Sequence, residues 1–354
     1  MLFKPDWLET KQRLTDFWNG KYIGRPCLAI YAPDPKPDSV VPEKPLSDRD
    51  LYLNIDVYLK NLWYRFSNTA YIGEALPSDA VMAGYTISYG AKVKFNPETV
   101  WIEPIENLDV DNESLFELDF NSPELKQFFD FYTKFAQAGS GKFLIGSPAI
   151  LPGHDLLSML MGSEKFMLTL MDKPVAMKSA IMKLARNWVI LNKKINDIYL
   201  QYQEGYGVCW HNLWGPYSFV STQSDISCML SREMFEQFVL DEIKLVGKEF
   251  GQVIYHLDGP GALHHVDTLC KVPEIKIIQW TPGAGNTLSV EKWLPLYKKI
   301  QDAGKIVMAH IMPEEVEFFI KHLDAKLSYI CTRTRTKRDA EILLTKVEKL
   351  CRSQ

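Results

Sequence analysis

Residues 252–285, QVIYHLDGPGALHHVDTLCKVPEIKIIQWTPGAG, contain the pattern that decides the fold. Two short apolar runs, at 253–255 and 275–280, each end in polar residues followed by Gly and Pro, with a short helix-like segment between them. A strand, a crossover and a second strand of this length form the βαβ unit of a parallel sheet. Functional groups gather at the carboxyl ends of such strands, where His256 and Asp258 are expected. Because side chains alternate along a strand, these two residues point to the same face.

The alternation of strands and helices continues through the second half of the chain and indicates an α/β fold with a parallel sheet. Strands are expected near residues 27, 70, 144, 207, 254, 277, 306 and 329. Eight strands close a (β/α)8, or TIM, barrel. The alternative is an open doubly wound sheet, but no GxGxxG motif follows an early strand to support a nucleotide site. We therefore expect a single TIM-barrel domain over residues 1–354.

Two regions are expected to elaborate this barrel. Residues 1–66 form an N-terminal extension, with amphipathic helices predicted over 1–20 and 50–66 and a proline-rich excursion between the first strand and the second helix. Residues 85–104 alternate in polarity on either side of a turn, which predicts a β-hairpin.

Composition excludes several classes of protein. With 354 residues, 46% of them hydrophobic, the chain can bury a large core. The formal net charge of -4 comes from mixed charges, so nucleic acid is not an expected partner. No apolar signal segment or run of about 18 apolar residues occurs, so a cytoplasmic location and no membrane partner are expected. Six cysteines without a CxxC pair predict free thiols, and any metal site must combine distant residues.

Four segments of the chain carry a family resemblance. They are FLIGSPAILPGHDLLSMLMGSEKFMLTLMDKP (143–174), SREMFEQFVLDEIK (231–244), YHLDGPGALHHVDTLCKVPEIKIIQWTPGAG (255–285) and KIVMAH (305–310). Together they resemble the uroporphyrinogen decarboxylase superfamily over roughly residues 140–345. Membership implies a TIM barrel and one of two chemistries. One is decarboxylation of a tetrapyrrole, and the other is methyl transfer by zinc enzymes that work with corrinoid proteins or folates.

The resemblance is closer to the corrinoid-linked zinc methyltransferase branch. The decarboxylase holds substrate carboxylates with an N-terminal motif of the type RQAGR, and nothing similar occurs here. The methyltransferase branch binds zinc with His-x-Cys at one strand end and a distant Cys in the last strand. The matching positions are His256, Asp258 and Cys331. The resemblance therefore implies that these three residues bind a metal, with His256 and Asp258 also acting in catalysis.

The chemistry of the three residues agrees with a metal site. Zinc accepts imidazole nitrogen, carboxylate oxygen and thiolate sulfur, and a catalytic site keeps one position open for substrate. A thiol held there becomes a thiolate at neutral pH and can accept a methyl group. Asp258 replaces a cysteine by a harder donor, which lowers zinc affinity, favours another metal or removes the metal altogether. The structural alternatives are a core histidine at 256, a turn-forming Asp258 and a small buried Cys331.

Further candidates follow other predicted strands and are expected to bind substrate. They are Glu74, His154, Trp210, His211, Gln279 and His310. Asp155, beside His154, is equally explained as a helix cap, and Asp225 as a structural or pocket-lining residue. His264 and His265 are expected to be exposed or packed in a crossover helix.

Three functions remain open from the sequence. The preferred one is a methyltransferase-like enzyme that moves a methyl group, with possible metal assistance, between a small substrate or corrinoid protein and an acceptor. The first alternative is a metal-free lyase that acts on a carboxylated substrate, which requires a cationic pocket. Arg333 is the exceptional basic residue at a predicted carboxyl end. The second alternative is a ligand-binding barrel without catalysis.

Overall fold

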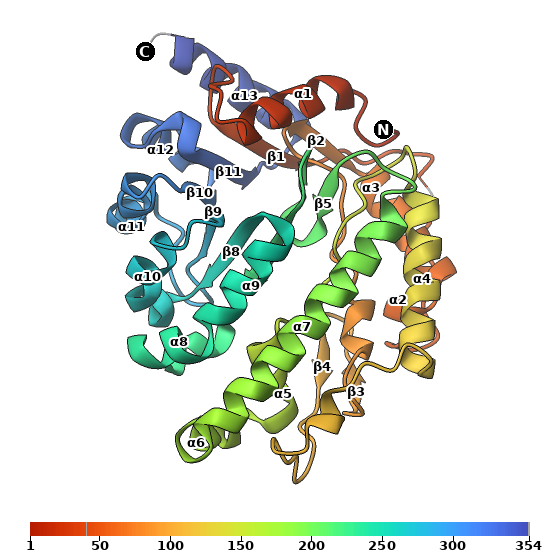
Figure 1. The fold of residues 1–354 in the computed structure, drawn as a ribbon. Coiled ribbons are helices and arrows are strands. Elements are labelled where there is room, and N and C mark those ends of the chain that lie inside the picture. The colour runs from red at the N-terminus through yellow and green to blue at the C-terminus, as the bar shows by residue number, and fades with distance from the viewer. Residues whose placement is uncertain (40, 353–354) are drawn as a thin grey trace.

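The computed structural model describes residues 1–39 and 41–352, and its central feature is a sheet of seven strands (Figure 1). The strands are β1 (Cys27–Pro33), β2 (Thr69–Gly73), β7 (Phe219–Gln223), β8 (Gln252–Asp258), β9 (Ile275–Thr281), β10 (Ile306–His310) and β11 (Ser328–Arg333). Their order in the sheet is β2-β1-β11-β10-β9-β8-β7. All neighbouring pairs are parallel except β1 with β2. The predicted α/β class with a mainly parallel sheet is therefore confirmed.

Helices connect and cover the strands. They are α1 (Trp7–Trp18), α2 (Asp50–Leu53), α3 (Ile55–Ser67), α4 (Pro123–Gly139), α5 (Gly153–Met161), α6 (Ser163–Asp172), α7 (Pro174–Tyr199), α8 (Arg232–Phe238), α9 (Leu240–Phe250), α10 (Val266–Cys270), α11 (Val290–Asp302), α12 (Val316–His322) and α13 (Lys337–Arg352). The Ser231 hydroxyl accepts a hydrogen bond from the Met234 amide at 3.2 Å and caps α8. The helical segment that follows is divided at Val239 into α8 and α9.

The direction of β2 differs from the prediction. It was expected as a parallel strand, but it runs antiparallel to β1, with Pro33 opposite Thr69 and Ala29 opposite Gly73. Gly73 has a φ of 64°, which lets the chain turn back after β2. The buried Lys4 ammonium donates to the carbonyls of Tyr71 and Gly73 and so fixes this turn. As a result, the carboxyl end of β2 lies beside the amino end of β1.

Two extended segments outside the seven strands, at 77–81 and 144–149, are hydrogen-bonded to each other. The Leu144 amide donates to the Pro77 carbonyl at 2.9 Å, and the Ala149 amide donates to the Val81 carbonyl at 3.1 Å. The strand predicted near 144 is therefore extended chain, with one parallel bridge from Ser147 to Val208. Val208 belongs to β5 (Tyr206–Val208), which matches the strand predicted near 207 and forms a hairpin with β6 (Leu213–Gly215).

Strand β7 was not predicted. Its sequence, FVSTQ, is half polar, so it lacks the apolar run by which the neighbouring strands were recognised. It nevertheless pairs in parallel with β8, where Gln223 is opposite His256. This pairing sets the position of the residues that follow β7.

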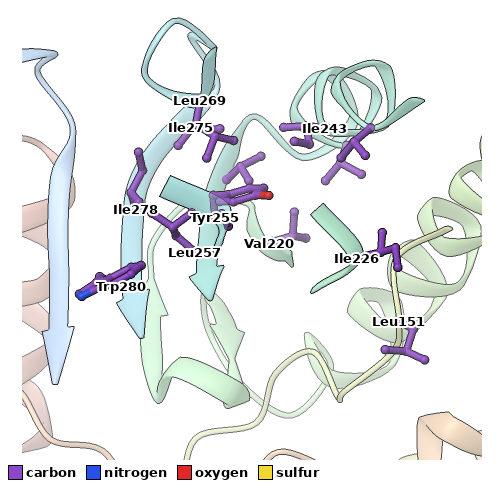
Figure 2. Close-up of a cluster of buried hydrophobic side chains, with 14 of the residues drawn as sticks. Leu151, Val220, Ile226, Ile243, Tyr255, Leu257, Leu269, Ile275, Ile278 and Trp280 are labelled. Atoms are coloured by element: carbon purple, nitrogen blue, oxygen red, sulfur yellow. The ribbon is translucent and has the colours of Figure 1, made fainter. Parts of the chain in front are cut away.

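The two faces of the sheet bury different clusters. Figure 2 shows the face toward the helices, where Tyr255, Leu257, Ile278 and Trp280 lie among apolar side chains that include Ile243 and Leu269. The alternate residues of the same strands, including Ile254, Ile277 and Met308, belong to a second cluster, here called the inner cluster. Helix α1 contributes to it at the amino ends of the strands, since the Phe17 and Tyr329 ring centroids are 5.8 Å apart.

Outside the main sheet, the predicted hairpin region contains β3 (Val93–Phe95) paired antiparallel with β4 (Val100–Ile102). The hairpin is shorter than the predicted 85–104 because residues Met82–Thr86 form a turn of 3₁₀ helix. Among the helices of the described residues, none combines the length and apolar character needed to cross a membrane.

Candidate functional site

Asp225, His256 and Asp258 converge at the carboxyl ends of β7 and β8. Each offers one potential ligand atom, and these atoms lie within 4.8 Å of one another. His256 and Asp258 are near the carboxyl end of β8 and point to the same face of the sheet, as predicted. Asp225 is the first residue of the 3₁₀ helix Asp225–Met229, which follows β7. We call this group the carboxylate–imidazole cluster. It exists because parallel neighbouring strands end at the same edge of the sheet.

The His256 ring is oriented by Gln279 on the adjacent strand β9. The Gln279 Nε2 donates to the Trp280 carbonyl at 3.0 Å and to the Thr281 hydroxyl at 2.9 Å. Its Oε1 is therefore the atom that is hydrogen-bonded to Nδ1 of His256. In the neutral ring, this arrangement places the proton on Nδ1 and leaves the lone pair on Nε2 of His256. Gln279, which is 2% exposed, holds the histidine instead of lining open space.

The Asp225 carboxylate is close to two others. It is open to solvent on one side, while protein surrounds it on the remaining sides. This partial burial raises the pKa of Asp225, and the negative charges of Asp155 and Asp258 raise it further, to about 7. A cation bound between the carboxylates would relieve their repulsion.

Asp155 positions the segment that carries Asp225. Its carboxylate accepts hydrogen bonds from the backbone amides of Asp225, at 3.0 Å, and Ile226, at 3.2 Å. Asp155 is buried in the first turn of α5, so these bonds connect the interior to the edge of the cluster. Asp155 therefore accepts hydrogen bonds from amides of the segment after β7, whereas its own helix, with Pro152 at the N-cap position, has no side-chain cap.

His154 is fully buried and lies behind the cluster, which leaves it no exposed surface for substrate. Its Nδ1 is 2.6 Å from Oε2 of Glu242. The same oxygen accepts the His154 amide at 3.1 Å, and Oε1 of Glu242 accepts the Gly153 amide at 2.6 Å. Burial alone would lower the pKa of His154, but the charges of Glu242 and Asp155 outweigh it and raise that pKa to about 9. The imidazole is therefore a buried cation at neutral pH.

Two ring side chains, Trp210 and His211, lie beside His256 on another side. The ring centroid of Trp210 is 5.7 Å from that of His256, and that of His211 is 6.2 Å away. The His211 Nε2 is bonded to the Ser221 hydroxyl at 2.8 Å. Burial is the main cause that lowers the pKa of His211 well below its usual value, and the charge of His256 lowers it further. Burial likewise lowers the pKa of His310, and the charges of Arg333 and His256 lower it further, to about 4. The imidazoles of His211 and His310 are therefore neutral at pH 7.

Cys331 does not join the carboxylate–imidazole cluster. Among the described residues, it is absent from any group of three or more potential metal ligands at that spacing. It lies opposite His310 in the sheet but packs within the inner cluster, 4% exposed. Burial raises the pKa of its thiol to about 12, although Arg333 opposes this shift. Asp225, which the sequence suggested as a structural or pocket-lining residue, takes the place expected for Cys331. Its place among the potential ligands was not predicted because strand β7 was not predicted.

Glu74 lies at the opposite end of the sheet. Its carboxylate binds Arg25 at 2.5 and 3.0 Å, Arg13 at 2.6 Å and the Leu28 amide at 2.7 Å, near the start of β1. Burial would raise the pKa of Glu74, but Arg25 and Arg13 lower it to about 2. A parallel β2 would place Glu74 at the carboxyl edge of the sheet with the predicted substrate-binding residues, but β2 is antiparallel. Glu74 instead anchors the turn after β2.

Comparison with known proteins gives a structural likeness. No protein-family model matches the sequence, and no curated protein matches it. The structure is similar to that of a methyltransferase from Methanosarcina mazei, with a TM-score of 0.58 and 10% sequence identity. The match covers 96% of this chain and 98% of that chain. At this identity the likeness shows that the two chains share a fold over nearly their whole length.

Proposed function

We propose that this protein is a methyltransferase-like enzyme and that its reaction centre is the carboxylate–imidazole cluster. The observation that carries the proposal is the convergence of Asp225, His256 and Asp258 within 4.8 Å at the carboxyl edge of the sheet. A fold shared with a methyltransferase supports the choice of reaction class. In this proposal, a methyl group passes from a small substrate or a corrinoid protein to an acceptor.

The same proposal includes a closed barrel of the uroporphyrinogen decarboxylase superfamily. Beyond β2, the segment at 77–81 is bonded to the segment at 144–149, which is bridged in turn to β5. Strand β5 lies against β7, the last strand at the other edge of the sheet. These contacts favour a closed ring over an open doubly wound sheet.

The cluster fits a divalent metal ion with nitrogen and oxygen ligands. Nε2 of His256 and one oxygen each from Asp225 and Asp258 would hold the ion. Zinc accepts this set, and manganese, iron or cobalt accept it as well, whereas a site built on thiolates does not fit because Cys331 lies elsewhere. When bound, such an ion would lower the pKa of an acceptor thiol or hydroxyl held on it.

The residues of the chain have separate tasks in this reaction. Gln279 keeps the Nε2 lone pair of His256 available, and Asp155 holds the backbone of Asp225 in place. Trp210, beside His256, covers part of the site with an apolar surface. A lone pair of the acceptor forms the new bond to the methyl carbon while the bond from that carbon to the donor breaks. The bonding electron pair leaves with the donor, and the acceptor proton passes to water at the open side of the cluster.

Metal titration tests the ligand set. Metal-free protein is titrated with Zn²⁺ by calorimetry and with Co²⁺ by visible absorption. Asp225→Asn is expected to weaken binding at least about tenfold, whereas Cys331→Ser should leave it unchanged. Asp241→Asn, which alters a surface carboxylate paired with Lys178, serves as the matched control. A sulfur-to-cobalt charge-transfer band that disappears in Cys331→Ser would show that the ligand set is wrong.

Methyl transfer is tested with methylcobalamin as the donor and thiols as acceptors, and the methyl thioether is detected by mass spectrometry. His256→Ala and Asp258→Asn are expected to abolish product formation, because each removes part of the cluster. Product formation that persists in both variants would contradict the proposed reaction centre. A protein that binds metal at the cluster but forms no thioether would contradict methyl transfer itself.

A further inference from the structure

Arg333, the last residue of β11, has no charged partner. Its side chain is exposed, and within residues 1–39 and 41–352 its guanidinium forms no ion pair and donates no hydrogen bond. Its central carbon lies 5.4 Å from the ring centroid of Tyr31 on the neighbouring strand β1. This cation–π contact supports the side chain without using its N–H groups.

Two other arginines near the sheet, by contrast, have charged partners. Arg25 is paired with Glu74, and Arg65 is paired with Asp79. Asp34, directly after β1, is bound by Lys36 at 2.7 Å and by Lys337 at 3.4 Å, so its charge is compensated without Arg333. The planar guanidinium of Arg333 therefore remains available at the carboxyl edge of the sheet to donate hydrogen bonds to a ligand.

The position of Arg333 relates it to the carboxylate–imidazole cluster. Tyr329 and Cys331 belong to the inner cluster, and Arg333 follows on the same face because side chains alternate along β11. His256 faces the same side of the sheet, two residues after Ile254 of the inner cluster. His310 ends β10, which lies beside β11 in the sheet, and His256 is near the end of β8, on the far side of β9. In the order of the strands, His310 therefore lies between Arg333 and the cluster.

We propose that Arg333 binds the carboxylate of a small acidic substrate whose reacting end reaches the carboxylate–imidazole cluster. A guanidinium can donate two parallel hydrogen bonds to a carboxylate, which gives both affinity and orientation. Arg333 then favours acceptors that carry a carboxylate. The identity of the reacting end rests on the proposed function.

A matched pair of probes tests the assignment. The binding of 3-mercaptopropionate and of its uncharged methyl ester to the full chain is measured by calorimetry. Wild-type protein should prefer the acid, and Arg333→Gln should weaken binding of the acid about 10- to 100-fold while leaving the ester unchanged. Arg333→Lys should keep part of the preference, since the charge remains but the fork is lost. Arg335→Gln, an exposed arginine two residues away, is the control and should behave as wild type.

The outcomes separate this inference from the proposed function. Equal binding of acid and ester by wild type, or equal losses in Arg333→Gln and Arg335→Gln, would overturn the assignment of Arg333. A preference for the acid that depends on Arg333, in a protein without methyl transfer, would support the assignment while the proposed function fails. Thermal unfolding of Arg333→Gln should match wild type, because the side chain is exposed and makes no ion pair.

Discussion

Gln279 and His256 form a hydrogen-bonded pair across β9 and β8, and the polarity of this pair is determined by the structure around it. The two amide hydrogens of Gln279 are donated to Trp280 and Thr281, so only its oxygen can face the imidazole. The ring must then carry its proton on Nδ1. A residue without charge thereby selects the tautomer of the proposed metal ligand.

Gln279→Leu should weaken metal binding about 10- to 100-fold, because the ring of His256 would lose the partner that fixes its orientation and tautomer. Gln279→Glu keeps an acceptor at the same position and should bind metal more tightly than the leucine variant. Calorimetric titration with Zn²⁺ measures both. Wild-type affinity in Gln279→Leu would show that the pair does not position the ligand.

Asp155→Ala should loosen the segment that carries Asp225. The backbone amides of Asp225 and Ile226 would lose their acceptor, which is expected to cost about 1–3 kcal/mol of stability for each amide left unpaired. Metal affinity should fall as well, and Asp155→Asn, which retains one acceptor oxygen, should be intermediate in both measurements. Urea unfolding and Co²⁺ titration supply the two readouts. A loss of stability with unchanged metal affinity would limit Asp155 to a structural role.

Glu74→Gln should destabilise the fold by about 3–5 kcal/mol, because it leaves the buried Arg25 without a counter-charge. The pKa of Glu74 is lowered to about 2, so its contribution is present above the unfolded pKa near 4.5 and is lost as the pH falls from there through 2. Urea unfolding at pH 7 and at decreasing pH measures the effect. Metal affinity should not change, since Glu74 lies at the other end of the sheet, and the matched variant Glu106→Gln, at an exposed loop position, should unfold like wild type.

His154 should make stability depend on pH in the alkaline range. Its pKa is raised to about 9, so the charged pair with Glu242 stabilises fully below the unfolded pKa near 6.5. This contribution is lost as the pH rises from 6.5 through 9. Urea midpoints across that range should therefore fall in wild type. They should fall less in His154→Asn, which cannot titrate, and identical slopes in the two proteins would contradict the assignment.

Local pattern was sufficient for much of the fold and part of the site. The apolar runs at β8 to β11 predicted a parallel sheet, and the period of two along β8 placed His256 and Asp258 on one face. These features depend on residues near one another in the chain. The same local reasoning misassigned Glu74, because the direction of β2 depends on the turn at Gly73 and on contacts from Lys4.

The sequence by itself determined the class of fold and one pair of site residues, since side-chain alternation and hydrophobic periodicity are properties of a single strand. Only the tertiary structure decided the third member of the cluster. Asp225 joins His256 because the half-polar β7 pairs with β8, while Cys331, a plausible ligand by strand position, packs among the buried side chains of the inner cluster. Strand register and packing bring together residues far apart in the chain, and no local pattern specifies which of them will meet.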